Sequence, residues 1–157
     1  MLDNDFSFMK RAIELSIENV KRGGGPFGAV IVKNGEILAE SCNLVAKLND
    51  PTAHAEINVI RASAQKLESF DLSGCILYSS CEPCPMCLGA IYWARIDRVI
   101  FANTTADAKN IGFNDKFIYE EISRPLQERS INFQQILRDE ALKAFKAWEE
   151  SENKVEY

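Results

Sequence analysis

Two short clusters of residues in this sequence have the types and spacing needed to bind a metal ion. Residues 54–56 read His-Ala-Glu and contain the single histidine of the chain, and residues 83–87 read Pro-Cys-Pro-Met-Cys. If a helix begins near the first proline, Cys84 and Cys87 share one face of its first turn, where the helix dipole favours thiolate over thiol. Two thiolates and an imidazole supply three of the four ligands of a tetrahedral zinc site. The sequence therefore predicts one zinc ion per chain, bound by His54, Cys84 and Cys87.

A nearby cysteine, Cys81, leaves a second arrangement open, in which His54 and three cysteines form a closed structural site. Such a site would belong to a non-enzymatic, zinc-stabilised interaction domain. Two arguments favour the open site instead. Cys81 precedes the proline that begins the predicted helix, so it lies off the face that carries the other two sulfurs. A closed site would also leave Glu56, a costly buried carboxylate beside the metal, without a function.

Glu56 follows His54 by two positions, so its carboxylate can lie beside the metal without binding it. An open zinc site lowers the pKa of water from 15.7 to about 7. Glu56 would take a proton from that water, pass it to a ring nitrogen and then protonate a departing amine. The paired patterns H-x-E and P-C-x-x-C are the signature of zinc-dependent nucleobase deaminases. The chemistry predicted is hydrolytic deamination; the alternative for Glu56 alone is a solvated carboxylate at a helix start.

The elements that position these clusters can be predicted from hydrophobic spacing and turn signals. Asn34-Gly35, between two apolar runs, predicts a β-hairpin. We expect strands at residues 27–33, 36–42, 75–80 and 98–102, and helices at residues 5–22, about 54–65, 83–94, 115–122 and 138–150, with a helical turn at residues 106–109. Strands that alternate with helices predict an α/β sandwich with ligands at helix N-termini.

Composition narrows the class of protein further. The chain has 157 residues, of which 46% are hydrophobic and 26% charged, as expected for one globular domain over residues 1–157. We find neither a run long enough to span a membrane nor a signal-peptide pattern, so no membrane partner is expected. Five cysteines are an odd number, and with two assigned to metal the remainder fit a reducing, cytoplasmic location.

Beyond the zinc signature, the chain resembles bacterial guanine deaminases of the cytidine deaminase-like fold along nearly its whole length. The matching segments are residues 25–32 (GPFGAVIV), 49–56 (NDPTAHAE), 80–95 (SCEPCPMCLGAIYWAR), 112–115 (GFND) and the terminal Glu156-Tyr157. The first and third segments are partly shared with transfer-RNA adenosine deaminases, whereas residues 112–115 and the terminal tyrosine point more narrowly to guanine. The resemblance implies a three-layer α/β/α sandwich with a central five-stranded mixed sheet, a homodimer, zinc, and conversion of guanine to xanthine and ammonia.

The resemblance also implies roles for several residues around the base. Phe27 would contact it through apolar surface, Asn43 through hydrogen bonds, and the backbone of Ala55 would lie against the ring. Asp115 would assist Glu56 in catalysis and accept the N–H donors around guanine C2, because a carboxylate is acceptor-only. Position alone leaves other interpretations open: Phe27 as a core residue, Asn43 as a turn residue and Asp115 as a helix cap.

Two aromatic residues, Trp93 and Tyr157, are assigned to the substrate site through a dimer. Trp93 lies nine positions after Cys84, about half a turn from the predicted zinc face, so it points either into the core or toward a partner. Because the resemblance implies a dimer, we expect it at a subunit interface near the neighbour's pocket. Tyr157 ends a tail, residues 151–157, that position alone would leave frayed. The resemblance favours a tail that closes over the purine as a lid. Whether the tail closes its own site or that of the partner subunit is left open.

Charge argues against a nucleic-acid substrate. The net charge is −5, and residues 131–157 hold four basic and six acidic side chains. Because binding to nucleic acid requires lysine and arginine to neutralise phosphates, we expect a small molecule, guanine, as the partner. A transfer-RNA adenosine deaminase is the alternative that this charge disfavours. The negative charge does not discriminate between guanine and other small substrates, namely a nucleoside, cytosine or an aminotriazine.

Overall fold

The structure is a computed structural model that describes residues 4–157. The chain divides into two compact units, the first ending at Lys116 and the second running from Phe117 to Tyr157. The expectation of one domain over residues 1–157, with a tail at residues 151–157, stays a prediction. Within the described residues, no helix combines the length and the apolar character that crossing a membrane requires.

Every helix and strand expected from the sequence is present. The first unit contains helices α1 (Asp5–Lys21), α2 (Val45–Leu48), α3 (Ala55–Leu67), α4 (Pro85–Trp93) and α5 (Thr105–Asn110), and strands β1 (Gly28–Lys33), β2 (Glu36–Cys42), β3 (Cys75–Cys81) and β4 (Arg98–Asn103). Helix α6 (Asp115–Ser123) spans the boundary, and the second unit adds a 3₁₀ turn (Leu126–Glu128) and α7 (Arg138–Glu150). The short α2 and the 3₁₀ turn were not predicted.

The sheet has the strand order β2-β1-β3-β4. Strands β1 and β2 form the expected antiparallel hairpin, and Asn34 and Gly35 in its turn have φ values of 53° and 79°. Positive φ at both positions is what a tight hairpin turn needs, and glycine adopts it without steric cost. Strand β1 is antiparallel to β3, whereas β3 and β4 are parallel, so the sheet is mixed.

The prediction of a five-stranded sheet is wrong, because the sheet has four strands among residues 4–157. After β4 the chain enters a capping box, in which Thr104 and Asp107 bond each other's backbone amides and begin α5. This cap takes the chain out of the strand direction, and the residues that follow form helices and turns. No further strand therefore pairs with β4 in the described chain.

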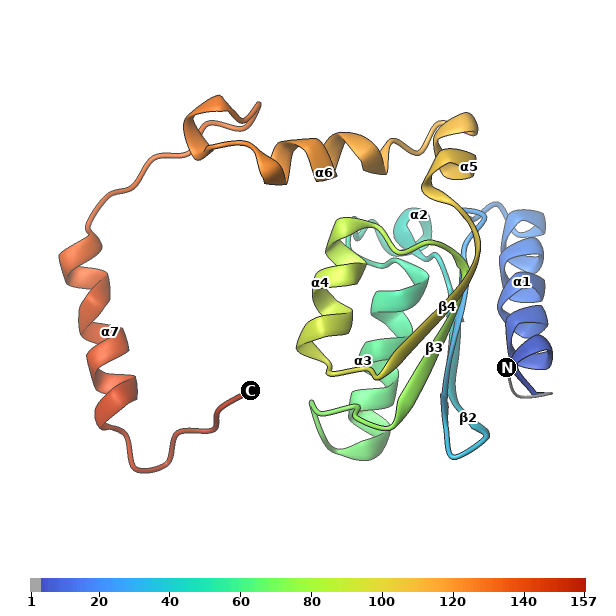
Figure 1. Ribbon diagram of the computed structural model, residues 1–157, viewed down its shortest axis with the longest axis horizontal. Coiled ribbons are helices and arrows are strands. Elements are labelled where there is room, and N and C mark those ends of the chain that lie inside the picture. The colour runs from blue at the N-terminus through green and yellow to red at the C-terminus, as the bar shows by residue number, and fades with distance from the viewer. Residues whose placement is uncertain (1–3) are drawn as a thin grey trace. The chain divides into compact units, whose positions relative to one another are not determined.

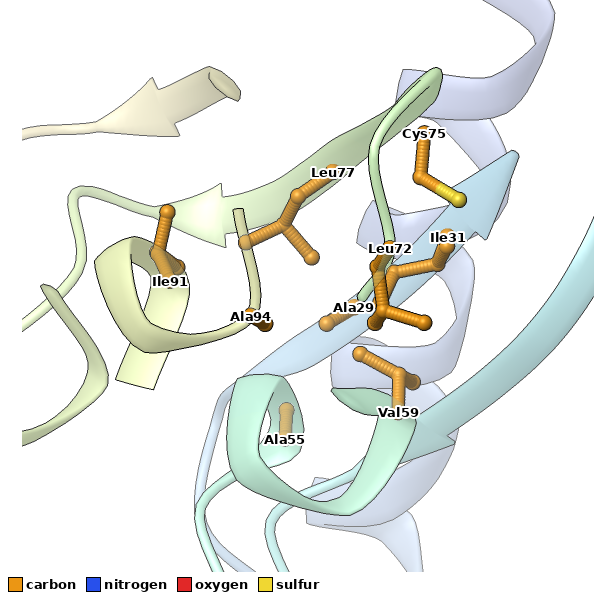
Figure 2. Packing of buried hydrophobic residues seen from close by; sticks show 9 residues of the cluster. All are labelled: Ala29, Ile31, Ala55, Val59, Leu72, Cys75, Leu77, Ile91 and Ala94. Carbon is orange, nitrogen blue, oxygen red and sulfur yellow. The ribbon is translucent and has the colours of Figure 1, made fainter. Parts of the chain in front are cut away.

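Helices cover both faces of the sheet, which confirms the three-layer α/β/α sandwich (Figure 1). The side chains of strand β1 alternate between the two faces of the sheet, and because helices cover both faces, almost all of them are buried. Val30 packs with α1 on one face, and Ile31 packs with α3 on the other. Figure 2 shows the second cluster, in which Ile31 lies among side chains of β3, α3 and α4. This core fixes the first turns of α3 and the C-terminal part of α4 against the sheet.

Helix α1 is also fixed to the sheet by a buried polar contact. The Tyr78 hydroxyl of β3 donates to Asp5 Oδ1 at 2.6 Å, and Arg98 of β4 donates to Asp5 Oδ2 at 2.8 Å. Asp5 is only 4% exposed, so these donors replace the water that its carboxylate loses on folding. Burial, and then the hydrogen bond with Asp5, raises the pKa of Tyr78 to about 12.

Candidate metal centre and active site

Two helix starts carry the predicted metal ligands. His54 is the N-cap of α3 and Cys84 the N-cap of α4, both with extended backbone, and Cys87 lies in the first turn of α4. The cysteine helix begins at Pro85, not at Pro83 as predicted. Pro85 suits the first helical position because its missing N–H has no partner there and its fixed φ is already helical. The positive ends of both helix dipoles therefore lie beside the ligand atoms.

The three ligand atoms lie at distances that fit a tetrahedral zinc ion. Cys84 Sγ is 3.5 Å from Cys87 Sγ, and His54 Nδ1 is 3.5 and 3.6 Å from these two sulfurs. Usual zinc–sulfur and zinc–nitrogen bond lengths at tetrahedral angles give separations of about 3.8 Å for the sulfur pair and about 3.6 Å for sulfur and nitrogen. The donor set and its spacing thus fit zinc, with three protein ligands.

The three ligand groups shift one another's pKa values. The pKa of Cys84 is lowered, first by its hydrogen bond with Cys87, whereas the same contact raises the pKa of Cys87. The pKa of His54 is raised, first by its hydrogen bond with Cys84. A thiolate here is thus stabilised by neighbouring protons, and a metal ion that binds the cluster takes their place.

Glu56, the second residue of α3, lies beside this cluster and is only 5% exposed. The Ser79 hydroxyl donates to Glu56 Oε1 at 2.9 Å, and Cys87 Sγ is 3.6 Å from Glu56 Oε2. Burial is the main cause that raises the pKa of Glu56, while the hydrogen bond from Ser79 opposes it. A buried carboxylate with a raised pKa, held by one oxygen, has the properties of a general base.

A cavity opens in front of the metal ligands and Glu56. It encloses about 360 Å³ of space free of atoms, part of it open to solvent. Its lining residues are Phe27, Asn43, His54, Glu56, Cys81, Glu82, Cys84, Phe113 and Asp115. The structure therefore places Phe27, Asn43 and Asp115 around one cavity with the metal ligands and Glu56.

The polar groups of the cavity differ in what they can offer a ligand. Asn43 Oδ1 accepts the backbone N–H of Val45 at 3.2 Å, so the Asn43 NH₂ group is the part left to donate. Asp115 is the first residue of α6, and burial, followed by the negative charge of Cys84, raises its pKa. The cavity thus combines an amide donor with a carboxylate acceptor.

Cys81 has a place of its own. It lines the cavity, but its Sγ contacts the carbonyl oxygen of Thr104 at 3.7 Å, and it does not belong to the group of His54, Cys84 and Cys87. Burial raises the pKa of Cys81 to about 11, which keeps it a neutral thiol at pH 7. This geometry favours the open metal site over the closed one.

Two predicted site residues of the first unit, Ala55 and Trp93, do not line the cavity, and a third, Tyr157, belongs to the second unit. The side chain of Ala55 is fully buried, at the first position of α3. Trp93, the last residue of α4, is 67% exposed, and Tyr157 in the second unit is 69% exposed. Their roles in substrate binding stay predictions.

Residues that sequence reasoning missed are also part of the site. Phe113 packs edge-on against Phe27, with ring centroids 4.8 Å apart, and Glu82 accepts the backbone N–H of Thr105 at 3.0 Å. Phe113 lies within the motif at residues 112–115, of which only Asp115 was predicted to contact the base. Ser79 could have been found from the sequence, because it is a polar residue on a buried strand that leads into the cysteine cluster.

Comparison with known proteins agrees with this geometry. Residues 2–103 match the cytidine and deoxycytidylate deaminase zinc-binding region, so the chain belongs to this family of zinc-binding deaminases. It is 54% identical to the guanine deaminase of Bacillus subtilis strain 168 over 155 residues, which span 98% of this chain and 99% of that protein. The X-ray structure of a guanine deaminase from B. subtilis superposes with a TM-score of 0.94 at 53% identity, covering 100% and 99% of the two chains.

More distant relatives fall into two groups. The structure of the guanine deaminase from Nitrosomonas europaea has a TM-score of 0.67 at 30% identity and covers 89% of this chain and 81% of its own. The tRNA-specific adenosine deaminase of Aquifex aeolicus is 43% identical over 95 residues, which are 60% of this chain and 63% of that protein. The likeness to the tRNA enzyme thus covers less than two thirds of either protein.

Proposed function

We propose that this chain is a zinc-dependent guanine deaminase that hydrolyses guanine to xanthine and ammonia. The observation that carries the proposal is the cavity in which Glu56 and the metal ligands lie together with Asp115 and Asn43. The extent of the likeness to guanine deaminases supports the same substrate. A zinc ion held by His54, Cys84 and Cys87 would activate water for attack at neutral pH.

Hydrogen-bond complementarity selects guanine in this account. Guanine carries N–H donors at N1 and on the C2 amine, which match the acceptor-only carboxylate of Asp115. Its carbonyl oxygen O6 is an acceptor, which matches the free NH₂ group of Asn43. Adenine has an amine at C6 and no donor at N1, so both matches would be lost. Phe27 and Phe113 supply the apolar surface for the ring.

Glu56 moves the protons in the reaction. It accepts one proton from water as the oxygen bonds to C2, and it passes that proton to ring nitrogen N3. It then transfers the remaining hydroxyl proton to the C2 amine, the carbon–nitrogen bond breaks, and ammonia leaves with both electrons of that bond. Ser79 holds the carboxylate in place through its hydrogen bond. Asp115 orients the base throughout these steps.

The proposal is tested by ammonia release from a panel of substrates. Purified, zinc-loaded protein is incubated with guanine, adenine, cytosine, their nucleosides and a short RNA hairpin. We expect guanine to react with a kcat/KM at least about 100-fold above adenine and adenosine, because both polar matches described above are lost with these substrates. Faster reaction of adenosine within the RNA hairpin would replace the proposal with a tRNA-specific function.

We propose further that the enzyme is a homodimer that exchanges its C-terminal segments. In the second unit, residues 117–157, no hydrophobic side chain is among the buried ones. Helix α7 leaves Leu142, Phe145 and Trp148 between 39% and 74% exposed. A segment of this length cannot build its own core, and in this proposal its apolar side chains pack on a second copy of the chain. Trp93, exposed on α4, would join this interface.

The tail makes a separate prediction within this proposal. Tyr157 offers an aromatic ring, a hydroxyl and the terminal carboxylate, which suit a lid over a flat purine. Deleting Glu156 and Tyr157 should leave folding, dimerisation and zinc content unchanged but lower kcat/KM for guanine by about tenfold or more. Unchanged kinetics would show that the tail does not close the site, and a monomeric wild-type protein in analytical ultracentrifugation would contradict the dimer.

We also propose a cytoplasmic location. All five cysteines are free, and Cys75, Cys81, Cys84 and Cys87 are buried as thiols or metal ligands, which suits a reducing compartment.

A further inference from the structure

One buried side chain outside the cavity, Asn19 near the end of α1, uses both of its N–H donors and its carbonyl oxygen on the segments that form the cavity. It is only 5% exposed. Asn19 Nδ2 donates to the carbonyl oxygens of Gly25 and Asn43, both at 2.8 Å, and Asn19 Oδ1 accepts the Cys42 thiol at 3.2 Å. Two donated bonds and one accepted bond also fix the orientation of the amide, because the opposite one would place oxygen against two carbonyls.

The loop after α1 lies directly on this amide. The backbone N–H of Gly24 donates to the backbone carbonyl oxygen of Asn19 at 2.9 Å. A Cβ atom added at Gly24 would lie 2.3–2.6 Å from the Asn19 side chain, so only glycine allows this approach. Asn19 is therefore enclosed by the loop that leads to Phe27 and by the segment that contains Asn43, and it ties them together.

Asn43 is held through its backbone on both sides. Its N–H donates to the carbonyl oxygen of Phe27 at 3.0 Å, and its own carbonyl oxygen accepts Asn19. A second side-chain amide holds the neighbouring residue: Asn58 of α3 donates to the carbonyl oxygen of Cys42 at 3.0 Å. With Asn43 Oδ1 bonded to Val45, the direction of the remaining NH₂ group depends on where this backbone is held.

We propose that Asn19 is a positioning residue for base recognition, which fixes Asn43 and the loop to Phe27 in the arrangement that receives the substrate. This inference rests on the proposed function. A donor that is held in place before binding loses less conformational freedom when the ligand arrives, so its loss weakens binding more than it slows the chemical step. Asn19 touches neither the metal ligands nor Glu56 in any hydrogen bond described above.

The test compares Asn19→Ala with the matched control Ser16→Ala. Ser16 lies one turn earlier on α1 and is also buried, but its hydroxyl bonds only the Ile13 carbonyl of its own helix. For Asn19→Ala we expect KM for guanine to rise at least about tenfold with kcat within about threefold, the pattern of lost uniform binding. Ser16→Ala should keep both constants, and both variants should keep one zinc per chain.

A double-mutant cycle separates positioning from a general loss of structure. If Asn19 acts through Asn43, Asn19→Ala should change KM by less than about twofold in an Asn43→Ala background. An equal rise in KM in both backgrounds overturns the proposal. Asn19→Asp keeps the shape but replaces the donating NH₂ by oxygen, and it should raise KM at least as much as Asn19→Ala. Failure of both variants to fold would show that Asn19 serves the fold and not the site, which also overturns the proposal.

Amide hydrogen exchange tests the inference without any turnover. Asn19→Ala should speed exchange at residues 42–45 by about tenfold or more while exchange in β3 is unchanged, because the loss is local. Unchanged exchange at residues 42–45 contradicts the positioning role even in an active enzyme. A wild-type protein that releases no ammonia from guanine overturns the proposed function instead, so the two failures are distinguishable.

Discussion

Removal of the Ser79 hydroxyl tests whether Glu56 must be held in one orientation for catalysis. The two side chains are 1% and 5% exposed, and the hydroxyl donates to Glu56 Oε1 at 2.9 Å. Hydrogen bonds to charged groups contribute about 1.5–3 kcal/mol, which corresponds to about 10-fold to 150-fold in rate. Glu56 keeps a hydrogen bond from its own backbone, so the lower part of this range applies. We therefore expect Ser79→Ala to lower kcat about 10-fold to 30-fold.

The assay is steady-state ammonia release from guanine at pH 7, with zinc content measured on the same samples. The adjacent Ser80 is a matched control, because it is also buried but its hydroxyl accepts the backbone N–H of Gly28 at 3.0 Å. Ser80→Ala should keep kcat within about twofold, and Ser79→Thr, which retains a hydroxyl, should recover much of the loss. A zinc-replete Ser79→Ala enzyme with wild-type kcat would refute the reasoning, as would an equal loss in Ser80→Ala.

Three other predictions follow from the site and the core. Glu56→Gln should keep zinc and guanine binding but lower kcat by about 10²–10⁴-fold, and near-normal turnover would remove Glu56 as the proton carrier. Cys84→Ser should lose the metal in elemental analysis whereas Cys81→Ser keeps it; equal loss in both would support a closed site. Tyr78 has a pKa raised to about 12 in the fold against an ordinary value of 10, so its contribution to stability is complete below pH 10 and is lost as the pH rises to 12. Chemical denaturation should show this decline in the wild-type protein and not in Tyr78→Phe, and parallel curves would contradict it.

Features that depend on neighbouring residues could be predicted from the sequence. Asn34-Gly35 fixed the hairpin because the turn conformation is decided by the residues in it. The metal ligands could be predicted for a related reason. Cys84 and Cys87 are one helical turn apart at the start of α4, and His54 stands at the start of α3. The start of α4 was placed at the wrong proline, because either one can occupy a first helical position.

Features that depend on distant contacts could not be predicted. The prediction of a fifth strand came from the resemblance, and no alternation of apolar and polar residues after β4 supported it. The chain instead enters the capping box at Thr104, and the sheet ends at β4. The bond from Ser79 to Glu56 joins residues 23 positions apart, and that from Asn19 to Asn43 joins residues 24 apart. Nothing in the local sequence specifies such pairs, which arise only when the strands and helices have packed.

Oxygen transfer from water to C2 of guanine is the most direct test of the central claim. The zinc-loaded enzyme is given guanine in ¹⁸O-labelled water, xanthine is analysed by mass spectrometry, and ammonia is counted in the same sample. Hydrolysis by Glu56 and the metal ligands predicts one ¹⁸O atom in each xanthine, one ammonia for each xanthine, and loss of both products when the metal is removed by a chelator. Guanine recovered unchanged in the presence of one zinc per chain would contradict the account.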